Sequence, residues 1–135
     1  MDVEIFALCD AATDSAGKLN LLGAFDRINV AEFPYVHPFC AVAVRVRFER
    51  IEQGNHHFRL DFVDMDGKAV LPTFEGNLGV NFPEAVHSVC TNMILNLGGV
   101  KFERAGQYSI DLAIDSRHER SLPVNVVRIE SAAAG

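Results

Sequence analysis

The residues best suited to chemistry are the acidic side chains of Asp64-Met65-Asp66-Gly67. Two carboxylates one residue apart, before a glycine, resemble the start of a calcium-binding loop. The twelfth position of such a loop would be Glu75, but an apolar stretch and a proline intervene. Together with Asp115, the two aspartates are weak candidates for a calcium site at one end of the fold. The favoured interpretation is a turn, because Asp-Gly is a strong hairpin signal of the type I′ class.

Histidine and cysteine give weaker signals. Neither His-x-x-x-His nor Cys-x-x-Cys occurs, so the sequence predicts no zinc site and no cofactor. A hydrolase using His87 or His118 with a carboxylate remains a third hypothesis, since catalytic groups need not be close in sequence. No nucleophile elbow or phosphate-binding glycine motif is present, and the chain is expected not to be an enzyme. The three cysteines are Cys9, Cys40 and Cys90, which is an odd number typical of reduced thiols in a cytoplasmic protein.

The strands that would position these groups are clearest between residues 40 and 64. Apolar and polar residues alternate on both sides of Gly54, which predicts a β-hairpin with a three-residue loop at residues 52–54. In that register Phe48 faces Phe58 and Val46 faces Leu60. The outer face of this hairpin would carry Arg45, Arg47, Arg59 and Asp61. This face is a candidate docking surface for an acidic partner, although a solvated charged face is the favoured interpretation.

The rest of the chain has the same two-residue period. We expect a loop at residues 10–17, a bulge or a close backbone approach at Gly23, and a connection at residues 32–38. A turn at residues 116–119 and a last strand at residues 122–129 complete the pattern. About eight antiparallel strands result, which indicates a β-sandwich, with a small barrel as the alternative. Gly106-Gln107-Tyr108 favours an immunoglobulin-like sandwich, because a tyrosine at this point often forms a tyrosine corner. Val63, Ile94 and Val127 lie opposite to the inward residues of their strands, so some outer faces should be partly covered.

Composition limits the partners. The chain has 135 residues, 12 Lys and Arg against 18 Asp and Glu, and a formal net charge of −6. This sign argues against binding to nucleic acid or to an anionic membrane surface. No export signal or membrane span is recognisable, so a cytoplasmic location is predicted. Residues 1–130 are expected to form one domain and residues 131–135 a flexible tail.

Several blocks also match a known pattern. They are Val3–Asp10, Gly17–Asp26, Arg45–Glu49, Asp64–Lys68, Gly106–Asp115 and Ser121–Val124. In this combination the chain resembles a family of short bacterial proteins described only as a domain of unknown function. The resemblance implies a compact β fold and assigns no site residues. The function predicted from the sequence is a non-enzymatic interaction module, acting as a homodimer or accessory subunit. The alternative is a small-molecule or carbohydrate-binding domain, assisted by calcium in one version.

Overall fold

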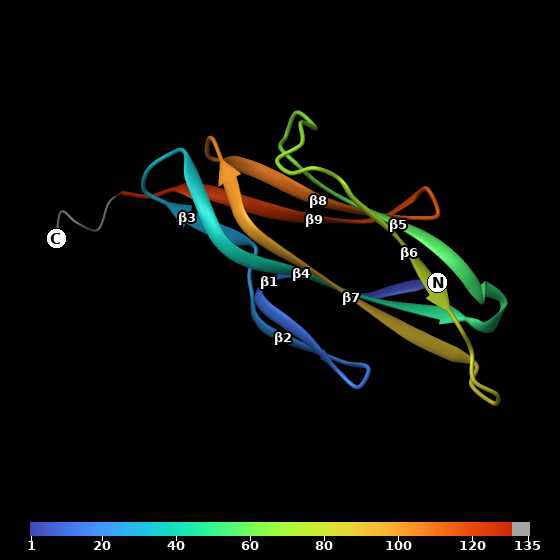
Figure 1. Cartoon of the computed structure of the whole chain (residues 1–135). Helices are drawn as coiled ribbons and strands as arrows, with labels where there is room; N and C mark the ends of the chain where they lie inside the picture. Colours follow the sequence, from blue (N-terminus) through green and yellow to red (C-terminus); the bar gives the residue numbers. More distant parts are fainter. Residues whose placement is uncertain (131–135) are drawn as a thin grey trace.

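Two β-sheets pack face to face in the computed structural model, which describes residues 1–130 (Figure 1). The predicted tail at residues 131–135 lies outside the described residues. The first sheet has the order β2-β1-β4-β7, formed by Lys18–Ala24, Asp2–Ser15, Tyr35–Glu49 and Ser88–Phe102. The second has the order β3-β9-β8-β5-β6, formed by Arg27–Val30, Arg117–Arg128, Gly106–Ile114, Gly54–Val63 and Phe74–Val80. The predicted all-β sandwich is confirmed.

The hydrophobic core lies between the two sheets and follows the predicted alternation. In β4 the inward side chains Val42, Val44, Val46 and Phe48 are at most 1% exposed. The facing sheet contributes a matching apolar row from β8, which consists of Tyr108, Ile110, Leu112 and Ile114. Burial of such rows is the main stabilising term of a sandwich, at roughly 25 cal/mol per Å² of apolar surface removed from water.

The strand order is that of an immunoglobulin-like sandwich. β1-β4-β7 occupies the places of strands A, B and E, while β9-β8-β5 occupies those of G, F and C. The Tyr108 hydroxyl, near the start of β8, donates a hydrogen bond of 2.6 Å to the carbonyl oxygen of Arg104. This is the tyrosine corner that the sequence suggested. Strand D, which would lie beside β7, has no counterpart among residues 1–130.

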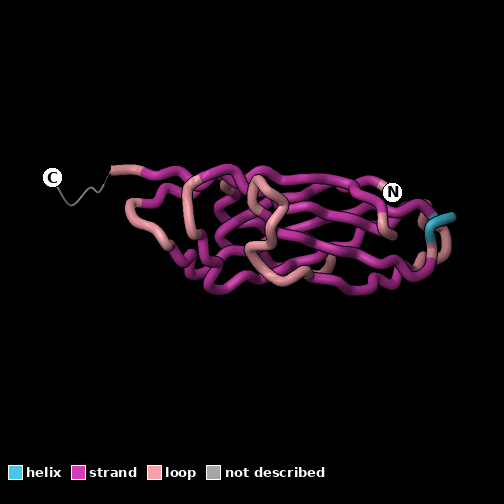
Figure 2. The backbone as a smooth tube through the Cα atoms, turned by 90° about the horizontal axis from the view of Figure 1, so that it is seen from above, coloured by secondary structure: helices cyan, strands magenta, loops and turns pink. Residues whose placement is uncertain are grey.

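The predicted hairpin between β4 and β5 is wrong. The two strands belong to different sheets and are joined by a short 3-10 turn, Arg50–Glu52, which carries the chain from one layer to the other at one end of the molecule (Figure 2). Phe48 lies opposite Val89 of β7, and Phe58 lies opposite Ile114 of β8. Alternation correctly identified the strands and their buried faces. It could not identify their neighbours, because every strand of a sandwich has the same period.

The expected loop at residues 10–17 is instead the second half of β1, which turns back at Ala16-Gly17 into β2. This β1–β2 hairpin lies on the outer side of β4 and β7, below them in Figure 1. Its residues Ala12 and Leu19, together with Ile94 of β7, pack on a small second cluster formed by Cys9, Ala41 and Ala43. The predicted coverage of Ile94 is therefore confirmed, and the cover is a segment of the same chain. Val63 is also partly buried, whereas Val127 is 37% exposed.

Gly23 is the position where the β1–β2 hairpin requires glycine. Its φ is +68°, and a Cβ there would lie 2.4 Å from the Asp10 carboxylate oxygen Oδ2. Of the two alternatives that the sequence left open at Gly23, the close approach is the one that this contact shows.

Two other predicted boundaries were wrong. β4 begins at Tyr35, inside the expected connection, and Pro38 is passed over in its ladder with β7. β9 begins at Arg117, because the turn before it needs only Asp115 and Ser116. Both of these residues have positive φ, as a two-residue type I′ turn requires.

Candidate functional site

The Asp64–Lys68 segment forms a hydrogen-bonded turn. Asp64 Oδ1 accepts backbone N–H bonds of 2.9 Å from Asp66 and from Lys68, and the Asp64 carbonyl accepts one from Gly67. Of the turn residues Gly67 alone has a positive φ, so the turn is not of the predicted type I′. Arg104 Nη2 lies 3.1 Å from Asp66 Oδ2 and 3.9 Å from Asp64 Oδ2. The guanidinium already supplies these carboxylates with a positive charge.

Asp115 does not join this pair. It follows β8, whereas Asp64 lies near the start of β8 beside Arg104 and Tyr108, so the whole strand separates them. The predicted cluster of three carboxylates is therefore not formed. Within residues 1–130, no group of three or more His, Cys, Asp or Glu side chains is arranged to hold a metal ion.

Asp115 instead binds His56, where the chain crosses between the sheets. His56 Nδ1 lies 2.6 Å from Asp115 Oδ2, and Nε2 lies 2.6 Å from the Glu52 carbonyl. Because both ring nitrogens meet acceptors, the protonated ring is favoured. The hydrogen bond to Asp115 raises the pKa of His56, and the same bond lowers the pKa of Asp115. The ring also stacks on Phe48 at 4.8 Å, so this pair fixes the crossover to the β8–β9 turn.

The four residues of the predicted docking face lie on two different sheets. Arg45 and Arg47, on β4, both bind the Glu4 carboxylate of β1, and the hydrogen bond from Arg47 is the main reason for the lowered pKa of Glu4. On β5, Arg59 Nε pairs with Asp61 Oδ2 at 2.8 Å. The four residues therefore do not form one surface, because the hairpin that would have joined them does not exist.

The two histidines of the hydrolase hypothesis are also separate. His118 Nε2 lies 2.7 Å from Ser121 Oγ, and that hydroxyl donates in turn to Asp111 Oδ1. The serine proton thus points to the carboxylate, so His118 is its donor and not its base. A nucleophilic triad needs the reverse order, in which the carboxylate orients the histidine. His87 lies in the connection before β7.

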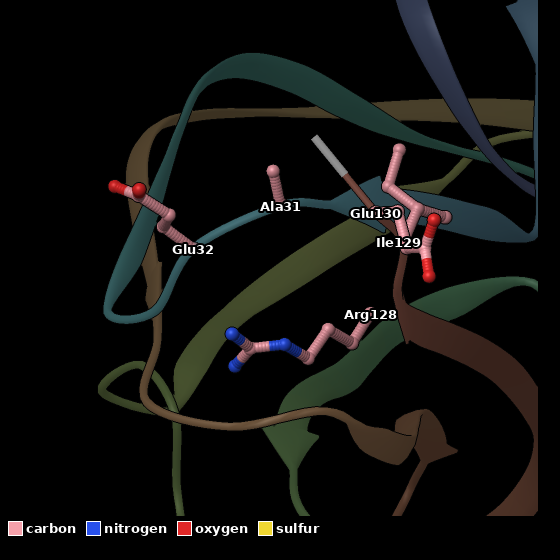
Figure 3. A pocket seen from close by; sticks show the side chains of 5 residues that line it. All are labelled: Ala31, Glu32, Arg128, Ile129 and Glu130. Atoms are coloured by element: carbon pink, nitrogen blue, oxygen red, sulfur yellow. The ribbon is translucent and has the colours of Figure 1, made fainter. Parts of the chain in front are cut away.

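Two surface hollows have polar linings. One of about 550 Å³ lies beside the Asp64 turn and is lined by Asp66, Lys68, Lys101 and Arg104 among others. The other, of about 450 Å³, lies between the residues that follow β3 and those that end β9 (Figure 3). Its charged side chains are Glu32, Arg128 and Glu130, and none of them points at another across the hollow. Both hollows lie among surface loops and strand ends.

The feature that the sequence did not reveal is the free edge of β7. Within residues 1–130, this 15-residue strand pairs with β4 and with no other strand, so its second row of backbone N–H and C=O groups has no ladder partner. Lys101 is its one charged residue, and it contains no proline. Native edge strands are usually short, charged or interrupted, because a free edge is a template for further pairing. The other edges are shorter, at seven residues for β2, four for β3 and seven for β6.

Beside this edge lies a small crevice of about 10 Å³ between the sheets. Its lining is mainly apolar and includes Leu95 and Leu97 of β7, with Leu71, Phe74 and one charged residue, Asp61, from the second sheet and its loop. Leu71, Phe74 and Leu95 are only partly buried. This side of the sandwich is where strand D of an immunoglobulin domain would lie. The sequence signal was the uncharged stretch from Ser88 to Val100, which reads as an ordinary half-buried strand.

Comparison with known proteins gives one family match over most of the chain. The model of DUF6941, a family of unknown function, matches residues 4–127. The chain belongs to the DUF6941 family. The match covers every strand except three end residues, Asp2, Val3 and Arg128, so the β7 edge and the His56–Asp115 pair both lie within the family domain. None of the curated proteins compared with this DUF6941 chain matches it.

The residues that the structure describes in this DUF6941 chain include no helix with the length and apolar character needed to cross a membrane.

Proposed function

We propose that this DUF6941 chain is a non-enzymatic interaction module that accepts an extended polypeptide strand along the free edge of β7. The observation that carries the proposal is the length of that edge, which is uncharged up to Lys101 and lacks a ladder partner within residues 1–130. Strand addition is a common recognition mode, in which backbone hydrogen bonds give affinity and alternate side chains give specificity.

The apolar crevice supports the same proposal. A strand added to β7 places every second side chain on the core side of the sheet, next to Leu95 and Leu97. The occupant is therefore an extended segment whose inward residues are apolar. Burial of those residues adds to the backbone hydrogen bonds and selects against polar segments.

The proposal includes a cytoplasmic location for the protein. Cys9, Cys40 and Cys90 are all free thiols. Cys9 and Cys40 are buried, and burial raises the pKa of the Cys40 thiol to about 11. Unreactive, unpaired thiols are compatible with a reducing, cytoplasmic environment.

The test is site-specific photocrosslinking in cells that express the chain. A photoreactive amino acid replaces Asn96, an exposed residue on β7, and as a matched control it replaces Asn77, an exposed residue on the edge strand β6. We expect a crosslinked polypeptide from position 96 and none from position 77. The residues of the partner that react with position 96 should be spaced two apart, as in an extended segment. Absence of any product at position 96, or equal products at both positions, would overturn the proposed function.

A further inference from the structure

The identity of the accepted strand follows from the side-chain rows of β7 itself. The pairing with β4 places Val89, Thr91, Met93, Leu95 and Leu97 on the core side and Ser88, Cys90, Asn92, Ile94 and Asn96 on the outer side. The core-side row is apolar apart from one threonine, and the outer row is mainly polar. A strand that extends this sheet needs the same arrangement, because its inward residues will cover the partly buried core-side residues of β7.

Pairing of β7 with β7 of a second copy always places core-side residues opposite core-side residues, whichever residue lies at the two-fold axis. When two copies of one strand pair antiparallel about a two-fold axis normal to the sheet, the residue at the axis faces its own copy. Every other residue then faces one of the same parity. Core-side residues of one copy thus face core-side residues of the other, which is the isologous contact of a two-fold dimer. Cross-strand apolar pairs of this kind each contribute roughly 0.2–1 kcal/mol to a sheet.

The absence of charge along β7 and the length of its uncharged stretch are compatible with a second copy of the chain as the added strand. The stretch from Ser88 to Gly98 has no charged residue, so symmetric pairing brings no like charges together. It ends at Gly99, where a positive φ of +68° changes the course of β7. Met93 is the midpoint of this uncharged stretch. An axis there places Leu95 opposite Thr91 and Leu97 opposite Val89 of the second copy.

We propose that two copies of this chain join through β7, paired antiparallel about a two-fold axis at Met93, so that their four-stranded sheets form one continuous sheet. The inference rests on the proposed function, since it names the strand that the β7 edge accepts. Each copy contributes its uncharged stretch to the other and covers the crevice beside Leu95. The partner is thus a second copy of the same chain rather than a different protein.

A charge-exchange experiment tests both the partner and the register. Native mass spectrometry of the untagged protein should give twice the chain mass of 14.8 kDa. Met93→Lys and Met93→Glu should each be monomeric at the concentration where the unchanged protein is dimeric, because two like charges would meet at the axis. An equimolar mixture of the two variants should regain the dimer, with one copy of each. Circular dichroism and thermal melting of each single variant test whether it is folded.

A second measurement needs no variant. Amide hydrogen exchange along β7 should slow as protein concentration rises, while exchange along the edge strand β6 should not change. Slower exchange at β7 supports the inference even if a position 93 variant fails to fold.

Three outcomes contradict the inference in distinguishable ways. A dimer that persists in folded Met93→Lys places the contact elsewhere. A monomer whose position 96 crosslinks to a different protein retains the proposed function but overturns self-pairing. A monomer without any crosslink at position 96 overturns both.

Discussion

Strands β4 and β7 are neighbours of equal length, with the same alternating pattern and very different surroundings. Each has 15 residues, but β4 lies between β1 and β7, whereas β7 has β4 on one side. Val42, Val44 and Val46 are at most 1% exposed, while the residues opposite them on β7 are only partly buried. Burial along these two strands therefore depends on how many neighbours each has, and β7 is the longest of the four edge strands among residues 1–130.

The largest expected effect contrasts the two strands at one cross-strand pair. Phe48 of β4 is fully buried and faces Val89 of β7, which is partly buried. Phe48→Ala should lower the free energy of unfolding by about 3–5 kcal/mol, because it removes a ring and leaves a cavity. Val89→Ala should cost about 1 kcal/mol, because its side chain is only partly removed from water. Urea denaturation of both variants measures the difference, and equal costs would show that β7 is as deeply packed as β4.

A second expected effect concerns the outer face of β4. Ala43 is 0% exposed and lies under the β1–β2 hairpin, next to Ala41 and Ile94. Ala43→Leu should destabilise the fold by about 1–3 kcal/mol, because the added atoms have no space. Hydrogen exchange should quicken in residues 10–24 as the hairpin is pushed away. The matched variant Ala24→Leu, at an exposed position in β2, should leave both the stability and the exchange unchanged; a loss there would attribute the effect to leucine in general.

A third prediction concerns the pH dependence of the β4–β5 crossover. The hydrogen bond to Asp115 raises the pKa of His56 above its ordinary value of 6.5, so the folded state holds the proton more tightly than the unfolded state. The resulting stability is fully present below pH 6.5 and is lost as pH rises through the raised pKa. His56→Gln should lower the free energy of unfolding by about 1 kcal/mol at pH 6. The free energy of unfolding of this variant should also decrease less as pH rises. Thermal melts from pH 5.5 to pH 9 measure it, with His57→Gln as the control. An unchanged pH profile in His56→Gln would assign the dependence to another group.

The smallest expected effect on stability comes with a large effect on association. Asn96 is exposed on β7, so Asn96→Lys should change the free energy of unfolding by no more than about 0.5 kcal/mol. A lysine on an edge strand opposes further pairing, so the same variant should not form the proposed dimer in native mass spectrometry. Asn77→Lys on β6 should change neither property. A dimer that survives Asn96→Lys would show that the β7 edge is not the contact between the copies.

The candidate site could be predicted from the sequence only in pieces. Asp64, Asp66 and Asp115 were recognisable as loop carboxylates, but which loops meet depends on the strand order. That order places Asp115 against His56 and Asp64 beside Arg104, at opposite ends of β8. Arg45 and Arg59 were both recognised as outward-facing, yet they lie on opposite faces of the sandwich because β4 and β5 belong to different sheets.

What the sequence determined by itself is local: most of the strands with their buried faces, the turn at Gly67, the special backbone at Gly23 and the tyrosine corner at Tyr108. Each depends on residues near one another in the chain, on a two-residue period or on the backbone freedom of one glycine. The tertiary structure decided the neighbours: β4 between β1 and β7, the β1–β2 hairpin over Ala43, and a free edge along β7. Backbone hydrogen bonds join any two strands alike, so the sequence pattern contains no signal for pairing. Packing of the whole chain selects the partner of each strand and leaves β7 with one.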